Sequence, residues 1–385
     1  MSSINDATVA VLGGGVAGCA AALALARSNV SSVCLIEWPN TSVQPIGESI
    51  PPDTRMLLQQ LGVWQEFIQQ GHEPCLGSLS AWGSTHIGYN DFVLNPYGNG
   101  WHVSRGLFEH MLVQGASQAG VRHLVGRRFL SGSSLEAGGF ILNLLGPNRR
   151  YERFRTRCVV DATGVGASFA RCAGAQPLFL DHLCFIYGFF ENLSEDKIHS
   201  TSTLLEATED GWWYLAAVPG NRVAVAYATD PELLRTRRLQ GYEQWMGALL
   251  RTELIAPRLN NHRILRQSLL VRPAPSFLLD RCDGPGWLAV GDAASAYDPI
   301  AAQGIYKALS TGIAAAHAIA AILRSETDNA RAYSDSVSAD FENYLTNRNL
   351  LYSYEQRWPD SLFWKLRHER SHLQQPGSTS HRSFA

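Results

Sequence analysis

Three glycines near the start of the chain have the spacing of a diphosphate-binding turn. Gly13, Gly15 and Gly18 follow an apolar run and open an alanine-rich one. Gly13 would permit a tight turn out of a strand, and Gly15 would let a pyrophosphate approach the backbone. Gly18 would let a helix pack closely, and the N-terminus of that helix would offer free N–H groups. The pattern predicts a dinucleotide site that also includes Ala17; a glycine-rich structural turn is the alternative.

An acidic residue follows where such a site needs one. Glu37 ends the apolar segment 33–37, about 20 residues after the turn, where a carboxylate accepts hydrogen bonds from ribose hydroxyls. The order strand, glycine turn, helix and strand over residues 7–37 therefore predicts a first βαβ unit.

Two further acidic motifs stand at the ends of buried apolar segments. Asp161 begins the sequence DATG, which ends at Gly164, and Gly291-Asp292 begins the sequence GDAA. A carboxylate at a strand end can accept strong hydrogen bonds from sugar hydroxyls. Either aspartate, taken alone, could equally be a helix N-cap.

In their order along the chain, these motifs resemble those of the flavoprotein hydroxylase and halogenase superfamily. The resemblance implies FAD as the cofactor, with Asp161 and Gly164 supporting its nucleotide end and Gly291-Asp292 holding the ribityl hydroxyls. It places the segment from Asp298 beside the isoalloxazine ring, where free N–H groups would stabilise negative charge on the reduced flavin. The predicted contacts beside the ring are Pro299, Gly304 and Ile305. Arg105 is predicted to contact the pyrophosphate.

The segment Gly47-Glu48-Ser49 resembles the G-E-S motif of flavin-dependent tryptophan halogenases, whose loop packs along the flavin, and we include Ser49 among the cofactor contacts. The catalytic lysine of those enzymes lies about thirty residues further on, but residues 1–196 contain no lysine. Their W-x-W-x-I-P segment is also changed, because Tyr214 and Ala216 stand at the tryptophan positions. The resemblance therefore favours oxygen transfer over halogen transfer.

Glu48 is the first candidate for proton handling, although a carboxylate that caps backbone N–H groups is an equal alternative. The histidines at positions 72, 86 and 102 are weaker candidates. The aromatic run Trp212-Trp213-Tyr214 either packs a sheet or lines a substrate cavity, and packing is favoured.

The whole arrangement is most similar to the LodB/GoxB/QhpG-type flavoproteins that mature tryptophylquinone-containing oxidases. The similarity rests on GESIPP, GWHVSR, GDAASAYDPIAAQGIYKAL and EQRWPDSLFW. It implies a monooxygenase that hydroxylates a tryptophan of a partner precursor protein during cysteine tryptophylquinone biogenesis, through a flavin C4a-hydroperoxide. The electron donor would be NAD(P)H or a flavin reductase. The alternatives are a small-molecule aromatic hydroxylase or halogenase, and a chaperone-like maturation partner with structural FAD.

The periodicity predicts an α/β fold with a discontinuous Rossmann-like FAD-binding domain, an inserted antiparallel-sheet substrate domain and a helical C-terminal segment. We expect the FAD-binding domain at residues 1–75, 101–175 and 285–330, and the substrate domain at 76–100 and 176–284. Residues 331–370 are predicted to be the helical segment, and residues 371–385 a disordered tail.

The composition limits the possible partners and the cellular compartment of the protein. The chain has 385 residues and a formal net charge of −2, which argues against nucleic acid and anionic membrane as partners. The seven cysteines have no metal-ligand spacing and suit a reducing compartment. The apolar stretch 313–323 is too short to span a bilayer. We therefore expect a cytoplasmic protein without a metal site.

Overall fold

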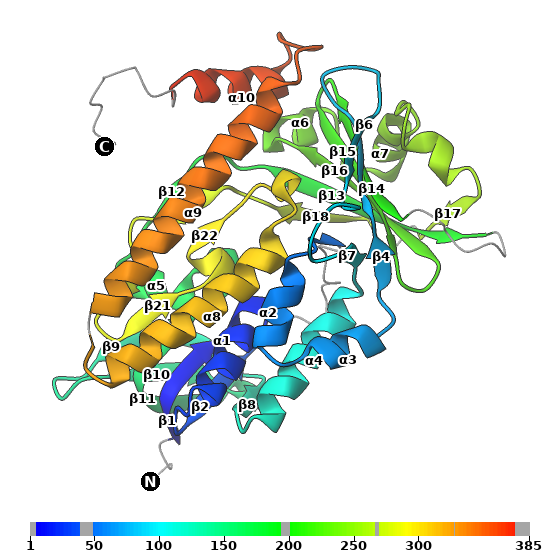
Figure 1. The fold of residues 1–385 in the computed structure, drawn as a ribbon. Coiled ribbons are helices and arrows are strands. Elements are labelled where there is room, and N and C mark those ends of the chain that lie inside the picture. The colour runs from blue at the N-terminus through cyan, green and yellow to red at the C-terminus, as the bar shows by residue number, and fades with distance from the viewer. Residues whose placement is uncertain (1–4, 39–48, 194–200, 266–268, 327, 374–385) are drawn as a thin grey trace. The chain divides into compact units, whose positions relative to one another are not determined.

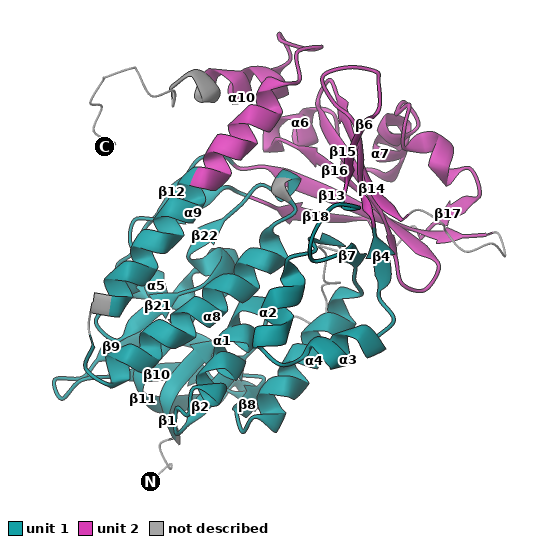
Figure 2. Cartoon of the chain, viewed as in Figure 1, with its two compact units in different colours: residues 1–75, 92–181, 275–342 teal, residues 76–91, 182–274, 343–385 magenta. Residues whose placement is uncertain are grey.

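A computed structural model describes residues 5–38, 49–193, 201–265, 269–326 and 328–373 (Figure 1). The chain forms two compact units (Figure 2). Unit 1 comprises residues 1–75, 92–181 and 275–342, and unit 2 comprises residues 76–91, 182–274 and 343–385. The boundary after residue 342 falls within helix α9 (Asp328–Ser353).

Unit 1 is built on a mixed sheet with strand order β20-β21-β11-β1-β2-β8, in which β10 also pairs with β11 and β9 pairs with β10. Strand β1 pairs in parallel with both β2 and β11. The β2–β8 and β11–β21 pairs are also parallel. The strands are β1 (Asn5–Leu12), β2 (Val33–Glu37), β8 (Arg122–Val125), β9 (Arg128–Ser134), β10 (Phe140–Leu145), β11 (Tyr151–Asp161), β20 (Asp283–Gly284) and β21 (Trp287–Ala289).

Helices and two small sheets complete unit 1. The helices are α1 (Val16–Arg27), α2 (Thr54–Gln60), α3 (Trp64–Gln69), α4 (Arg105–Gln118), α5 (Ser168–Cys172) and α8 (Gly304–Leu323). One small sheet has the order β3-β7-β4 and the other the order β12-β19-β22. Their strands are β3 (Ser49–Ile50), β4 (Glu73–Cys75), β7 (Gly100–His102), β12 (Pro177–Phe179), β19 (Phe277–Leu279) and β22 (Ser295–Ala296).

Helices α1 and α8 pack closely because small residues line their contact. A Cβ atom added to Gly312 of α8 would lie 2.6 Å from the backbone oxygen of Ala17 and 3.0 Å from the Cβ atom of Ala20. Helix α8 is long and apolar enough to cross a membrane, and 72% of its apolar segment is buried within the structure. The helix begins at Gly304, well before the stretch 313–323, so the prediction that this apolar segment is too short to span a bilayer was wrong. Its burial within the structure accounts for its apolar character.

Unit 2 contains a sheet of order β17-β13-β16-β15-β14-β5-β6, with β18 paired to β13. Among the described residues of this sheet, only the β14–β5 pair is parallel. Its strands are β5 (Gly77–Ala81), β6 (Gly88–Asp91), β13 (Cys184–Asn192), β14 (Ser202–Thr208), β15 (Gly211–Val218), β16 (Arg222–Thr229), β17 (His262–Ile264) and β18 (Leu270–Pro273). Its helices are α6 (Pro231–Thr236), α7 (Tyr242–Leu249) and α10 (Leu362–Leu373). Trp213, Leu215, Val225 and Ile186 on one sheet face form a core with Trp245 of α7.

The fold class expected from the sequence is confirmed. The two units group residues 92–100, 176–181 and 275–284 with unit 1 rather than with the antiparallel sheet, and they divide the expected C-terminal helical segment after residue 342. Helices α9 and α10 occupy the segment expected to be helical. Of the expected tail, residues 371–373 belong to α10 and the rest lie outside the described part of the chain.

Candidate functional site

The glycine turn of unit 1 joins β1 to α1 and has the steric features that the sequence predicts. Gly13 has φ +110°, and a Cβ atom there would lie 2.2 Å from the backbone oxygen of Ala162. A Cβ atom on Gly18 would lie 1.9 Å from the oxygen of Gly13. At Gly15, which caps α1, an added Cβ would meet nothing within 4 Å. The turn is therefore tightly packed at Gly13 and Gly18 and open at Gly15, as a cradle for a diphosphate requires.

Glu37 lies against this turn at the end of β2. Its carboxyl carbon would be 2.4 Å from a Cβ atom built on Gly14, and its Oε2 atom is 2.7 Å from Nε2 of His123 on β8. The carboxylate is about one quarter exposed. The carboxylate thus lies against the turn at Gly14. The sequence did not predict His123 as its partner, because β8 is far from β2 along the chain.

Asp161, at the end of β11, is fully buried and its carboxylate binds the turn that follows it. Oδ1 accepts hydrogen bonds from the backbone N–H and the hydroxyl of Thr163, and Oδ2 accepts them from the N–H groups of Phe169 and Ala170. Burial raises the pKa of Asp161, and these hydrogen bonds act in the opposite direction. The carboxylate therefore supports its loop, in which Gly164 has φ +66° and open space at its Cβ position.

The GDAA motif meets the glycine turn directly. Gly291 has φ +57°, and a Cβ atom there would be 2.7 Å from the Cβ atom of Ala17. Its N–H donates to the hydroxyl of Thr311 on α8 over 2.9 Å. These contacts explain why both Gly291 and a small residue at position 17 are needed, and they bring the first and third motifs together.

Asp292 is half exposed and is paired with a lysine. Its Oδ1 atom is 2.8 Å from Nζ of Lys307, a side chain that is only 6% exposed, whereas that of Asp292 is 51% exposed. Sequence reasoning missed Lys307, although its position within GIYKAL, three residues after Gly304, could have marked it as a first-turn residue of α8.

The segment between Asp292 and α8 is held by a buried aspartate. Asp298 is fully buried, and its Oδ1 atom accepts a hydrogen bond from the N–H of Ile300 over 3.0 Å, which fixes the short turn that begins at Pro299. Gly304 starts α8, is exposed and has open space at its Cβ position, whereas Ile305 is buried. A ligand could therefore approach the α8 N-terminus at Gly304.

Arg105 and Ser49 lie in other parts of unit 1. Arg105 is the first residue of α4, and its Nε atom is 2.8 Å from Oε1 of Glu109. Ser49 is opposite His102 in the β3–β7 pair. Glu48, the first candidate for proton handling, lies outside the described residues.

The three histidine candidates differ. Burial lowers the pKa of His72 and of His102 to about 4, so both are neutral at pH 7. His72 is hydrogen bonded, since its Nδ1 accepts from the N–H of Ser104 and its Nε2 is 2.9 Å from Gln70. His86 is exposed in unit 2. Neutral histidines with such low pKa values are poorly suited to hold a proton at neutral pH.

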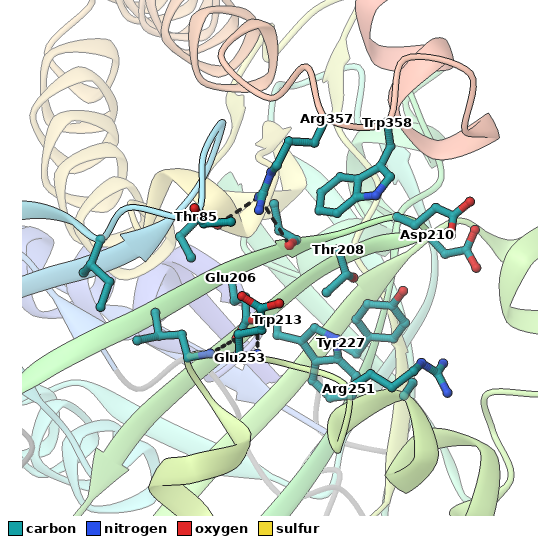
Figure 3. Close-up of a pocket in the computed structure, with 16 residues that line it drawn as sticks. Thr85, Glu206, Thr208, Asp210, Trp213, Tyr227, Arg251, Glu253, Arg357 and Trp358 are labelled. Atoms are coloured by element: carbon teal, nitrogen blue, oxygen red, sulfur yellow. Dashed lines mark hydrogen bonds between the residues drawn. The ribbon is translucent and has the colours of Figure 1, made fainter.

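Unit 2 carries a pocket of about 580 Å³ on the sheet face that α7 covers (Figure 3). The rings of Trp213 and Tyr227 stack there with centroids 4.4 Å apart. Buried Glu206 accepts hydrogen bonds from the N–H groups of residues 253–255 and so holds one wall. Arg357 points into the pocket beside Trp358. Trp213 therefore both packs the sheet and lines a pocket, whereas Trp212 packs on the opposite face with Phe185.

Comparisons with known proteins agree with this geometry. The family model described as an FAD binding domain matches residues 6–339. LodB of Marinomonas mediterranea, named as an FAD-dependent oxidoreductase, is 26% identical over 367 residues, which cover 94% of this chain and 97% of LodB.

Two solved structures share the fold. The myxobacterial chondrochloren halogenase CndH has a TM-score of 0.87 at 21% identity, covering 96% of this chain and 88% of CndH. The peptidyl tryptophan dihydroxylase QhpG, described as essential for tryptophylquinone cofactor biogenesis, has a TM-score of 0.74 at 20% identity, covering 94% of this chain and 78% of QhpG.

Proposed function

Because this chain belongs to the FAD binding domain family, we propose that it is an FAD-dependent monooxygenase that hydroxylates a tryptophan side chain of a partner precursor protein during cysteine tryptophylquinone biogenesis. The chain is an FAD-dependent oxidoreductase by its family and its relatives. The observation that carries the proposed tryptophan hydroxylation is the fold shared with QhpG over 94% of this chain. QhpG is described as a peptidyl tryptophan dihydroxylase, and the similarity to LodB along almost the whole of both chains supports flavin-dependent oxidation.

The residues of unit 1 fit FAD. The open position at Gly15 and the close packing at Gly13 and Gly18 suit the pyrophosphate, and Glu37 beside the turn suits the ribose of the adenine half. The half-exposed carboxylate of Asp292 suits the ribityl hydroxyls. We assign Ala17, Asp161, Gly164 and Gly291 to the packing that keeps these groups in place.

When bound and reduced by the external electron donor, FAD would supply the two electrons that activate dioxygen, so that one oxygen atom can pass to an electron-rich ring while the other leaves as water. The protein's part is to bind the cofactor, exclude water and orient the target indole. The N-terminus of α8 at Gly304 would stabilise negative charge on the pyrimidine edge of the ring, with Pro299 and Ile305 shaping the approach. Arg105 would contribute at the pyrophosphate by sharing its contact with Glu109, and Ser49 would line the same cofactor. Glu48 is the proposed proton handler.

The proposed partners are the precursor of a quinone-containing oxidase and an external electron donor, NAD(P)H or a flavin reductase. A cytoplasmic location is part of the proposal, because a precursor would be modified where reduced flavin is supplied.

The test incubates the purified holoprotein with reduced flavin, dioxygen and a precursor protein, followed by mass spectrometry of the precursor. We expect a mass increase equal to one or two oxygen atoms on a tryptophan, together with oxygen consumption that depends on the precursor. The matched control replaces that tryptophan by phenylalanine. An unmodified precursor would contradict hydroxylation, and equally fast turnover of free tryptophan would contradict a protein substrate.

A small-molecule halogenase is the second candidate, and the fold likeness to the halogenase CndH is what favours it. The absence of lysine from residues 1–196 opposes it, since the halogenase lysine expected from the G-E-S motif has no counterpart there.

A further inference from the structure

Lys307 is a buried cation in the first turns of α8. Its Nζ atom donates to Oδ1 of Asp292 over 2.8 Å and also to the backbone oxygen of Ser295. It lies 4.2 Å from the centroid of the Tyr297 ring. An ammonium group has three N–H donors, and here a carboxylate, a carbonyl and an aromatic face surround it.

A lysine in this place costs desolvation that an apolar side chain would not. The Lys307 side chain is only 6% exposed, and methionine would fill a similar volume without a charge. Asp292, its counter-charge, remains half exposed. The Lys307 ammonium is therefore fixed in position inside unit 1, whereas the Asp292 carboxylate that it contacts stays accessible to a ligand.

The contact with Lys307 restricts the orientation of the Asp292 carboxylate. A carboxylate has about four lone-pair sites on its two oxygens, so one contact to Lys307 leaves others for a ligand. The contact fixes one oxygen relative to α8 and limits rotation of the carboxylate, which removes conformational freedom that a bound ligand would otherwise have to restrict.

We propose that Lys307 is a positioning residue for the cofactor: it holds Asp292 in the orientation that accepts the ribityl hydroxyls of FAD. This inference rests on the assignment of Asp292 to the ribityl chain in the proposed function. Lys307 is not available as a free amine, because its N–H groups are hydrogen bonded and its side chain is buried. Positioning Asp292 gives this buried lysine a function.

The test measures binding of FAD and of ADP to the full-length protein carrying Lys307→Met. ADP contains the adenine, ribose and diphosphate but no ribityl chain, so it reports on the glycine turn and not on Asp292. We expect the dissociation constant of FAD, from flavin fluorescence on dilution, to rise about tenfold or more, because a charge-assisted contact supports the binding group. The inhibition constant of ADP as a competitor should stay within about twofold of the wild-type value.

Three further variants sharpen the result. Lys307→Arg keeps the charge and should restore part of the FAD affinity. Asp292→Asn combined with Lys307→Met should bind FAD no more weakly than Asp292→Asn alone, because Lys307 is proposed to act through Asp292. Lys365→Met removes an exposed lysine of α10 and should leave both constants unchanged.

The proposal is overturned if Lys307→Met binds FAD as tightly as the wild type, if FAD and ADP weaken equally, or if the two substitutions weaken FAD binding additively. Equal weakening would mean that Lys307 only stabilises unit 1. If Lys307→Met folds poorly on its own, the comparison of the double variant with Asp292→Asn still shows whether Lys307 acts through Asp292. None of these readouts involves the precursor, so failure of tryptophan hydroxylation and failure of this proposal are distinguishable.

Discussion

Individual residues of the glycine turn have different physical reasons for being glycine. Gly13 needs glycine because its backbone is in the left-handed half of conformational space and a Cβ atom would overlap the oxygen of Ala162. Gly15 has neither constraint, since its φ angle is −74° and an added Cβ meets no protein atom. Its role must therefore be sought in what binds next to it.

This difference predicts that Gly15→Ala weakens FAD binding without destabilising the protein. The added methyl group occupies the space into which the pyrophosphate would come, so the dissociation constant of FAD should rise about tenfold or more, equivalent to about 1.4 kcal/mol. Urea unfolding of the apoprotein should stay within about 0.5 kcal/mol of the wild type. Gly247→Ala in α7 of unit 2, where an added Cβ also has space, is the control. Unchanged FAD affinity in Gly15→Ala would remove the pyrophosphate from this position.

At the scale of elements, the contact between α1 and α8 sets how closely the first and third motifs approach. Gly312, Ala17 and Ala20 allow the two helices to lie nearly in backbone contact. A larger residue would push α8 away, and with it Lys307 and Gly304.

We therefore expect Gly312→Ala to lower the free energy of unfolding by about 1–3 kcal/mol, as overpacking does. The measurement is urea unfolding followed by circular dichroism. Gly247→Ala in α7, where a Cβ atom has space, is the matched helical control and should be neutral or slightly stabilising. Wild-type stability in Gly312→Ala would show that the helices can separate without cost.

The small sheet β3-β7-β4 contains one buried histidine, His102, and a second, His72, directly precedes β4. Burial lowers both pKa values from 6.5 to about 4. The unfolded chain therefore binds more protons than the folded protein between these pH values. Stability is fully present above about pH 6.5 and falls as the pH decreases toward 4.

The expected slope is about 1.4 kcal/mol per pH unit for each histidine in that window. Urea unfolding between pH 7 and pH 5 should show this decrease, and His72→Gln should remove about half of it. His86→Gln, at an exposed position, should not change the slope. A wild-type stability that stays constant from pH 7 to pH 5 would contradict neutral burial of these histidines.

At the scale of the whole molecule, the distribution of lysine separates oxygen transfer from halogen transfer. Residues 1–196 contain no lysine, and Lys307 is buried in its pair with Asp292. An amine able to carry an activated halogen is therefore absent from the region that the halogenase motif would require.

With reduced flavin, dioxygen, a precursor and bromide present, we expect oxygenated and not brominated precursor. Mass spectrometry distinguishes the two through the isotope pattern of bromine. A parallel reaction without bromide gives the reference level of oxygenation. A brominated product would favour the halogenase alternative and would require a halogen carrier other than the expected lysine.

Local sequence patterns predicted the dinucleotide turn and the α/β class, because both depend on glycines and on apolar periodicity among neighbouring residues. FAD as the cofactor was implied by the resemblance of the three motifs to those of a flavoprotein superfamily. Asp161 illustrates the limit: its motif was identified, but only the structure revealed that four hydrogen bonds to residues 163–170 occupy its carboxylate. The pairs Glu37–His123 and Asp292–Lys307, and the pocket that unites Glu206, Tyr227 and Arg357, were likewise decided by tertiary structure. Their partners come from different strands and helices, so strand order, register and helix packing determine which side chains meet, and local sequence patterns do not encode that.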